Sequence, residues 1–261
     1  MKQILFAAVV LLLVSACGSR QEKKAEKIET TTETVDYTDT ASLDVGHVDT
    51  AENKLIKLQS SKEETEADKA RKLNQKRART AFNNGVEYSK RGEMEKAKEA
   101  FKRVLEFDPE NEKACNNLGK IYYDMGQKEI ALSFYEDAVR FNDADSASMV
   151  GAGLILFEKR DYNAALEYYN MAIKTASHYA LAYYDRGTLL GYQKNYGGAL
   201  IDMNKAIEID PNNSKYYMNR GLANHYLERF QQACDDWDKA ASMGNAEAQK
   251  ALKLYCKKAE K

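Results

Sequence analysis

Few side chains in this sequence could do chemistry, and none of them belongs to a catalytic or metal-binding motif. The histidines His47, His178 and His225 lie far apart, and the sequence contains no HExxH or CxxC motif. It also contains no glycine-rich phosphate loop before a helix and no nucleophile elbow. Cys115 is expected to be a small buried hydrophobic residue rather than a nucleophile. The sequence therefore predicts a protein that is not an enzyme and that binds no cofactor, metal ion or small-molecule substrate.

Cys17 follows a segment with the features of a secretory signal. In residues 1–16, Lys2 precedes an apolar run of 11 residues, which is too short for a spanning helix of about 20 residues. The sequence VSAC that ends at Cys17 resembles the bacterial lipobox, whose cysteine is acylated and becomes the mature N-terminus. The resemblance implies lipidation of Cys17 and, because Gly18 rather than Asp follows it, anchoring in the outer membrane. Since two or more acyl chains hold a protein stably, we expect an envelope lipoprotein, on the periplasmic face or the cell surface.

Three cysteines, Cys115, Cys234 and Cys256, remain once Cys17 is lipidated. In an oxidising compartment, an odd number leaves at least one thiol without an intramolecular partner. Cys234 lies ten residues before Gly244 and Cys256 twelve residues after it, so a helical hairpin turning there offsets the two by about 3 Å. A disulfide requires Cα atoms within about 7 Å and facing Cβ atoms. The hairpin permits a Cys234–Cys256 bond without ensuring it.

A repeat of 34 residues predicts the structural units that position these residues. Glycine recurs at this interval without insertion or deletion, at Gly85, Gly119, Gly153, Gly187 and Gly221. With this glycine at position 8 of each unit, position 20 is always alanine. Position 24 is large in every unit, with Phe101, Tyr135, Tyr169, Met203 and Trp237. A fixed period of this length is typical of a stack of identical supersecondary units.

The pattern resembles the tetratricopeptide repeat, a pair of antiparallel helices. The resemblance implies an all-α fold, a right-handed α-solenoid with five such helix-turn-helix units over residues 78–245. Small residues at positions 8 and 20 let the paired helices approach closely, and the large residue at position 24 fills the space between units. Gly92 and Gly126 suit the turn within a unit, where a left-handed backbone is easiest for glycine. Pro109 and Pro211, the two prolines of the chain, stop second helices.

The segments on either side of the repeats have different roles. Residues 17–77 begin with a stretch poor in aromatic residues, which we expect to be a disordered tether. Ser61 and Glu64 form a capping box, so a lead-in helix is predicted up to Arg77 and into the first repeat. Residues 246–261 have helical spacing of apolar side chains and are predicted to be a capping helix.

Two tripeptides of the tether resemble an O-glycosylation acceptor of some Gram-negative bacteria. They are Asp39-Thr40-Ala41 and Asp49-Thr50-Ala51. Chance explains such short matches as well, so both readings stay open. The chain has 39 basic and 40 acidic residues, and this balance leaves no excess of positive charge for binding nucleic acid.

The resemblance also implies that the first helix of each unit lines a concave groove, with positions 2, 5, 6, 9, 12 and 13 exposed. Rings beside asparagines suit an extended peptide, because Asn can pair with the peptide backbone while rings contact its side chains. The candidate peptide-binding residues are Phe82, Asn83, Asn116, Asn117, Lys120, Tyr123, Leu154, Phe157, Tyr184, Thr188, Tyr192, Met218, Asn219 and His225. The other groove positions are Val86, Val150, Asp185, Leu222 and Tyr226. Several of these side chains could instead pack against neighbouring first helices.

Known relatives with this repeat suggest what the groove binds. The carboxylate clamp that some of them use for chaperone C-termini is absent, because Phe82 and Val86 stand where Lys and Asn belong. The expected function is a lipid-anchored adaptor or assembly factor that binds an extended segment of a protein partner. The alternatives are a scaffold that holds a peptidase or a peptidoglycan enzyme, or a component of a secretion, gliding or polysaccharide-export machine.

Overall fold

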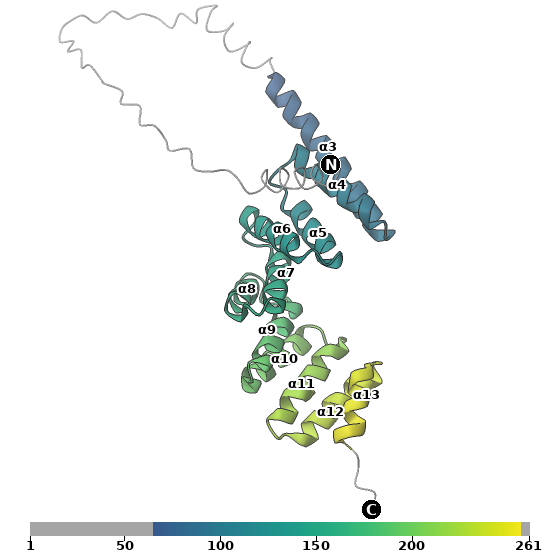
Figure 1. Cartoon of the computed structure of the whole chain (residues 1–261), viewed down its shortest axis with the longest axis vertical. Coiled ribbons are helices and arrows are strands. Elements are labelled where there is room, and N and C mark those ends of the chain that lie inside the picture. Colours follow the sequence, from purple (N-terminus) through teal and green to yellow (C-terminus); the bar gives the residue numbers. More distant parts are fainter. Residues whose placement is uncertain (1–64, 257–261) are drawn as a thin grey trace, which may run out of the picture. The chain divides into compact units, whose positions relative to one another are not determined.

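The computed structural model describes residues 65–256, and this range contains eleven helices and no strand (Figure 1). The helices are α3 (Glu66–Lys90), α4 (Met94–Phe107), α5 (Glu112–Asp124), α6 (Lys128–Phe141), α7 (Ser146–Glu158), α8 (Tyr162–Thr175), α9 (Ala180–Tyr192), α10 (Tyr196–Ile209), α11 (Ser214–Tyr226), α12 (Phe230–Ser242) and α13 (Ala246–Tyr255). Cys17, the two tripeptides, the Ser61–Glu64 box and residues 257–261 lie outside the described residues. The chain divides into two units between Arg77 and Ala78.

Helix α3 includes both the predicted lead-in and the first helix of the first repeat. Its N-terminus is capped by Thr65, whose hydroxyl accepts the Asp68 N–H at 3.2 Å and donates to the Asp68 carboxylate at 2.9 Å. From Glu66 the helix continues without a break to Lys90, through the boundary between the two units. Good helix formers and this reciprocal cap explain why it starts there.

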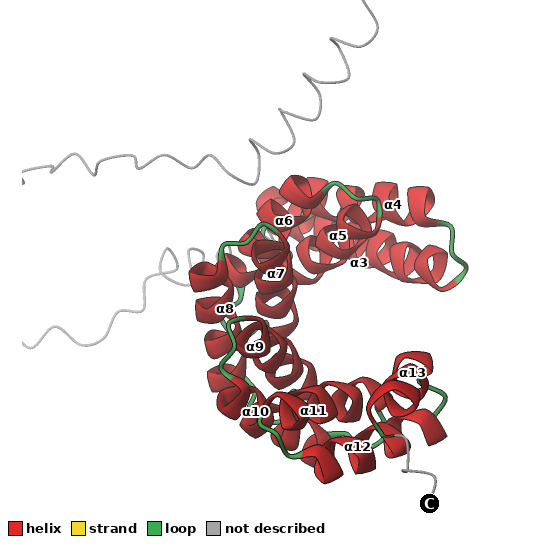
Figure 2. Ribbon diagram, turned by 60° about the horizontal axis from the view of Figure 1, so that its bottom comes forward, coloured by secondary structure: helices red, strands yellow, loops and turns green. Residues whose placement is uncertain are grey.

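Within the second unit, each 34-residue repeat forms one antiparallel hairpin, as predicted. The hairpins are α3–α4, α5–α6, α7–α8, α9–α10 and α11–α12, and α13 packs on α12. In Figure 2 the first helices of the repeats follow the inner side of this unit, and the second helices follow its outer side. Apolar helix faces are thus buried between successive repeats to form an α-solenoid.

The glycines at position 8 are closely approached by the second helix of their repeat: by the backbone of the alanine at position 20 in the last two repeats, as predicted, and by the side chain at position 24 in all five. A Cβ added to Gly153 would lie 2.6 Å from the Tyr169 ring, and one added to Gly221 would lie 2.6 Å from the Trp237 indole. The ring at position 24 therefore occupies the space above the glycine. The alanine at position 20 is buried behind it, fully in four of the five repeats.

The turn inside each repeat requires a left-handed residue at position 15. Gly92 and Gly126 fill it in the first two repeats with φ of 73° and 74°. Arg160, Lys194 and Glu228 fill it in the other three with φ of 65°, 63° and 59°. A residue other than glycine is strained in this conformation, so each of these three turns is less stable than it would be with glycine at position 15.

Lys194→Gly is expected to raise the free energy of unfolding by about 0.5–1 kcal/mol, because glycine adopts this backbone without strain. Urea unfolding followed by circular dichroism measures the change. The matched control is Gly126→Ala, which introduces the same strain where nothing lies within 4 Å of an added Cβ, and should destabilise by a similar amount. Equal free energies of unfolding for wild type, Lys194→Gly and Gly126→Ala would contradict the conclusion that the left-handed backbone at position 15 strains a side chain.

A disulfide joins α12 to the end of α13. Cys234 and Cys256 are bonded with their Cα atoms 5.7 Å apart, so the hairpin turning at Gly244 has the facing geometry that the sequence left open. Ala248 and Ala251 of α13 are buried against α12. The bond closes a loop between residues 22 apart in sequence, and therefore limits fraying of the last helix.

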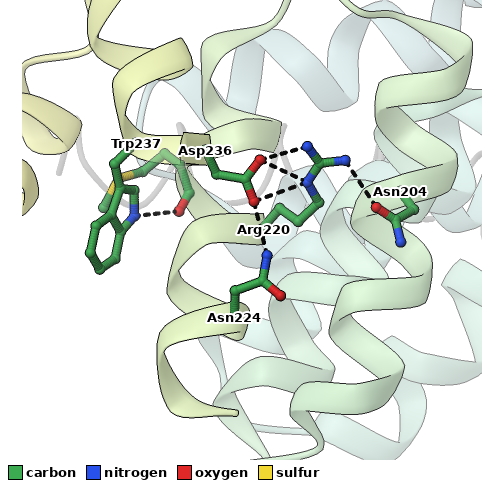
Figure 3. A network of polar contacts seen from close by, with 6 residues as sticks. Asn204, Arg220, Asn224, Asp236 and Trp237 are labelled. Carbon is green, nitrogen blue, oxygen red and sulfur yellow. Dashed lines mark hydrogen bonds and ion pairs between the residues drawn. The ribbon is translucent and has the colours of Figure 1, made fainter. Parts of the chain in front are cut away.

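The last two repeats contain a polar network that the first three lack. Arg220 of α11 donates to the Asp236 carboxylate of α12 through Nε at 3.0 Å and Nη2 at 2.5 Å. Its Nη1 donates to Asn204 Oδ1 of the preceding repeat at 3.0 Å, and Asn224 Nδ2 donates to Asp236 Oδ2 at 3.0 Å (Figure 3). Asp236 is 5% exposed; both donors to this buried carboxylate come from α11 of its own repeat, and Arg220 extends the network to Asn204 of the repeat before it.

The same arrangement occurs one repeat earlier. Arg186 of α9 donates to Asp202 of α10 through Nε at 2.8 Å and Nη2 at 2.7 Å. Its Nη1 donates to Asn170 Oδ1 of α8 at 2.8 Å. Each arginine thus ties the two helices of its own repeat to the second helix of the repeat before it.

Candidate functional site: the inner face of the repeats

The candidate site is the inner face, which we define as positions 2, 5, 6, 9, 12 and 13 of the first helices. Neighbouring first helices touch one another, since α7 contacts both α5 and α9 and α11 contacts α9. Side chains of one repeat therefore reach the next, and several predicted groove residues have partners there.

In the first repeat, the predicted groove residues divide into packed and exposed ones. Phe82 is partly buried, and its ring meets the Phe101 ring edge-on with centroids 5.5 Å apart. Asn83 is exposed. The Phe82 ring thus packs partly on the core of its own repeat, and its role as a groove contact stays a prediction.

The two asparagines of the second repeat are already engaged through their amide nitrogens. Asn116 Nδ2 donates to Ser148 Oγ of the third repeat at 2.5 Å and to Oδ2 of Asp145, the N-cap residue of α7, at 3.3 Å. Asn117 Nδ2 donates to the Lys113 carbonyl of its own helix at 2.7 Å. Asn116 thus links two repeats, and only its carbonyl oxygen and that of Asn117 remain to accept from a peptide N–H.

Tyr123 also connects two repeats across the inner face. Its hydroxyl donates to Glu158 Oε1 at 2.7 Å, and Lys128 lies 2.9 Å from Glu158 Oε2. Burial and the bond to Glu158 raise the pKa of Tyr123 to about 12, so its hydroxyl stays a donor at every physiological pH. Lys120, one turn before it, is exposed.

Aromatic side chains gather where the third and fourth repeats meet. Phe157 contacts Tyr162 and Tyr192, each with ring centroids 5.8 Å apart, and Tyr162 and Tyr192 are separated by 5.2 Å. Phe157 also packs against the core of the third repeat, together with Leu156 and Leu166, while Tyr192 is 58% exposed. Tyr192 is therefore the ring of this group that a partner can reach. Leu154 is partly buried, and Val150 is buried at 4% exposure, so Val150 is not a groove residue.

A pocket of about 400 Å³ lies between α9, α11 and the start of α13. It is lined by Tyr184, Ser214, Lys215, Met218, Asn219, Gly244, Asn245, Ala246 and Glu247. Three predicted groove residues, Tyr184, Met218 and Asn219, thus meet at one place. The Tyr184 ring packs on the Tyr216 ring with centroids 5.1 Å apart.

Thr188 contributes to the pocket wall indirectly. Its hydroxyl donates to the Tyr184 carbonyl at 2.8 Å and accepts from Asn219 Nδ2 at 3.2 Å. This bond orients the Asn219 amide and leaves its carbonyl oxygen to accept from a ligand. Asn245, the last residue of the predicted repeats, and Glu247 of the predicted capping helix were not predicted as groove residues, because neither lies on a first helix of a repeat.

His225 is partly buried against the capping helix. Its ring lies 4.6 Å from the Tyr255 ring of α13 and 5.6 Å from Trp237, and its Nδ1 is buried without a hydrogen-bond partner among the described residues. The capping helix therefore covers this position of the last repeat. Tyr226, the next residue, is 55% exposed and stacks on Tyr196 with centroids 4.5 Å apart.

Asp185 of α9 is an acid of the inner face, at position 6 of the fourth repeat. It is partly buried, and burial raises its pKa from an ordinary 3.8 to about 7, against the opposing charge of Lys215. No hydrogen-bond donor pairs with its carboxylate within residues 65–256. The sequence placed Asp185 on the groove by its position in the repeat, but it offered no signal that the carboxyl lacks a partner.

No group of three or more His, Cys, Asp or Glu side chains in residues 65–256 is arranged to hold a metal ion. Among the helices that the structure describes, none combines the length and the apolar character needed to cross a membrane.

Comparison with protein families returns one kind of match. A family model described as TPR repeat matches residues 85–126. Models described as tetratricopeptide repeat match residues 116–180 and 180–213. No curated protein matches the chain.

Solved structures agree on the fold. MamA is 25% identical with a TM-score of 0.54, and the alignment covers 68% of this chain and 94% of MamA. YrrB, described as a TPR protein with an unusual peptide-binding site, is 23% identical with a TM-score of 0.56, covering 73% of this chain and 99% of YrrB. PilF of Pseudomonas aeruginosa is 18% identical with a TM-score of 0.63, covering 70% of this chain and 86% of PilF. From its 34-residue period, its stacked helical hairpins and these matches, the chain belongs to the tetratricopeptide repeat proteins.

Proposed function

We propose that this protein is an adaptor of the bacterial cell envelope that binds an extended segment of a protein partner on its inner face. The observation that carries the proposal is the pocket of about 400 Å³, where α9, α11 and α13 bring a ring, a thioether, amides and charged groups together. Mixed apolar and polar walls of this kind bind ligands by burying side chains and fixing orientation with a few hydrogen bonds.

The polar groups of the inner face can form hydrogen bonds with a peptide backbone. The carbonyl oxygens of Asn117 and Asn219 can accept N–H groups, since only their nitrogens are engaged by the protein. The exposed ring of Tyr192 offers a contact for an apolar side chain. Binding energy at such surfaces concentrates in a few residues near the centre.

Selection from a library of random 12-residue peptides displayed on phage tests the proposal. The full chain should enrich a family of peptides, and Tyr192→Ala with Asn219→Ala should weaken a selected peptide by about 1–3 kcal/mol. Isothermal titration calorimetry measures the affinity, and circular dichroism checks that the helical content is unchanged, because stability in a solenoid comes mainly from contacts between repeats.

The matched control is Met171→Ala with Lys174→Ala on α8, where Met171 is 43% exposed and Lys174 is also exposed. These substitutions remove a similar amount of exposed surface from a second helix and should leave peptide binding unchanged. If the control pair weakens binding as much as the inner-face pair, the ligand occupies another face. If no peptide is enriched, the inner face does not bind extended segments.

The second part of the proposal is the lipid anchor, which is supported by the VSAC sequence ending at Cys17. Cys17→Ala should move the protein from the membrane fraction to the soluble fraction, or leave it unprocessed, because the acyl chains supply the membrane affinity. Fractionation of cells followed by immunoblotting measures the distribution. Recovery of the variant in the outer-membrane fraction at the wild-type level would refute lipidation at this residue.

A further inference from the structure

We propose that the disulfide between Cys234 and Cys256 controls binding in the pocket, so that the oxidised protein binds its peptide tightly and the reduced protein binds it weakly. The inference rests on the proposed function, because it concerns regulation of the pocket between α9, α11 and the start of α13. It depends on α13 (Ala246–Tyr255), which lies beyond the segments that match the family models.

The start of α13 forms one wall of the pocket. Gly244, Asn245, Ala246 and Glu247 are four of its nine lining residues, and the others come from α9 and α11. Asn245 Nδ2 donates to Ser214 Oγ at the start of α11 at 3.4 Å, which is long for a hydrogen bond. This direct link holds the wall weakly, so the shape of the pocket depends on how firmly α13 is docked on α12.

The packing that docks α13 is made mostly by small side chains. Ala248 and Ala251 are its buried residues, and Leu252 is partly buried beside them on the core shared with α12. The Tyr255 ring lies 4.6 Å from the His225 ring but is 59% exposed. With ten residues, α13 is shorter than the length of about 12–15 residues at which isolated helices become marginally stable in water. It therefore stays folded only while it is held against α12.

The disulfide holds the other end of this helix. It joins Cys234 of α12 to Cys256, the C-cap residue of α13, and closes a loop between residues 22 apart in sequence. A cross-link of this length favours the closed arrangement on the order of 100-fold, because it removes conformational entropy from the open chain. Breaking the bond shifts α13 toward the undocked state. Since so short a helix does not stay folded in part, its first residues leave the pocket as well.

Met218 connects the docking of α13 to the pocket from the side of α11. It lines the pocket, and it also packs against the core cluster that contains Ala248 and Ala251 of α13. Its carbonyl accepts the Trp237 Nε1–H at 3.2 Å, and the Trp237 ring lies 5.7 Å from the Tyr255 ring. Undocking of α13 thus removes both the wall made by its first residues and part of the support of the Met218 side chain.

Reduction of the bond is a thiol–disulfide exchange with a dithiol reductant. A thiolate of the reductant attacks one sulfur, the Cys234–Cys256 bond breaks, and the second thiol of the reductant releases the mixed disulfide. The protein takes up two electrons and two protons as two thiols, and the reductant leaves with a new disulfide. Cys234 and Cys256 are both partly exposed, which gives a small dithiol access to the bond. Cys115 is buried, and the exchange does not require it.

The probe is a phage-selected peptide whose binding is weakened by Asn219→Ala, since Asn219 lines the pocket. Reduction of the wild-type full chain with dithiothreitol should weaken binding of this peptide about fivefold or more in titration calorimetry, because only the docked fraction binds tightly. Reoxidation should restore the affinity. Cys234→Ser with Cys256→Ser should bind as weakly as the reduced wild type, and dithiothreitol should not change its affinity. The matched control is Cys115→Ala, which should respond to reduction as wild type does.

Two measurements follow α13 without a peptide. On reduction, hydrogen exchange should show that the amides from Ala248 to Tyr255 lose protection, whereas the amides of α9 and α10 keep it. Trp237, the only tryptophan of the chain, is 1% exposed, and its emission should shift to longer wavelength as the Tyr255 ring leaves it. Neither signal should change when dithiothreitol is added to the serine variant.

The outcomes separate this inference from the proposed function. Equal affinity of the oxidised and reduced proteins would overturn control by the disulfide while leaving peptide binding intact. A loss of protection that extends to α9 and α10 would show that the bond stabilises more than α13, and would overturn release of this helix as the cause. If Asn219→Ala weakens none of the selected peptides, they bind outside the pocket and the inference is wrong. Failure to enrich any peptide would overturn the proposed function and this control of binding with it.

Discussion

Asp236→Ala is expected to lower the free energy of unfolding by about 3 kcal/mol. The substitution leaves the Arg220 guanidinium and the Asn224 amide without the acceptor that they share. Because the carboxylate is 5% exposed, water cannot simply replace it, although the Arg220 side chain is 25% exposed and recovers part of its hydration. This exposure is why the expected loss lies at the lower end of the range for buried pairs.

The single tryptophan makes this measurement local. Trp237 follows Asp236, is 1% exposed and donates from Nε1 to the Met218 carbonyl at 3.2 Å (Figure 3). Its fluorescence during urea unfolding therefore reports on the last repeat, and circular dichroism reports on all the repeats. For Asp236→Ala, we expect the midpoint of the fluorescence transition to lie at a lower urea concentration than the midpoint of the ellipticity transition, because repeats are coupled mainly to their neighbours.

Two variants serve as controls for the network. Asp238→Ala lies on the same helix at an exposed position and should change stability by less than about 0.5 kcal/mol. Arg220→Met with Asp236→Leu replaces the pair by apolar groups of similar size and should recover part of the lost stability, because no buried charge is left unpaired although Asn224 still lacks its acceptor. If Asp236→Ala is no more destabilising than Asp238→Ala, the network does not stabilise the repeat.

The repeat period predicted the helical hairpins because it depends on contacts that every unit makes. Gly153 and Gly221 meet the ring at position 24 in the same way, and this constraint appears in the sequence as a strict interval. The buried arginine–aspartate pairs leave a weaker pattern in the sequence. It consists of an Arg at position 7 and an Asp 16 residues after it, as in Arg186 and Asp202. This signal occurs in only two of the five repeats, so a search for features common to all repeats passes over it.

The inner face was harder to predict, because its long side chains reach into the next repeat. Asn116 and Phe82 have the right positions for a groove, yet the first is bonded to Ser148 and the second packs on Phe101. His225 is covered by the capping helix, which the repeat numbering does not include. Position within a repeat identifies the face on which a side chain begins, and the partner it finds depends on its length and on the neighbouring unit.

Asp185→Asn is expected to stabilise the protein relative to wild type in a way that depends on pH. In the unfolded chain this carboxyl ionises near its ordinary pKa of 3.8, whereas in the folded chain burial raises the pKa to about 7. Between these values the folded chain keeps a proton that the unfolded chain has released, so wild-type stability falls as the pH rises through this window. Asn does not titrate, and the stability difference in favour of the variant should therefore grow by about 4 kcal/mol from below pH 4 to above pH 7.

Urea unfolding of both proteins between pH 4 and pH 8 measures this difference, and Glu167→Gln, an exposed acid on α8, should run parallel to wild type. Taking the difference between proteins removes the titration of the other groups near Asp185, namely Lys215 and the surrounding tyrosines. Parallel curves for Asp185→Asn and wild type would mean that the carboxyl is well solvated and that its charge costs nothing. A widening gap would mean that the charge destabilises the folded protein.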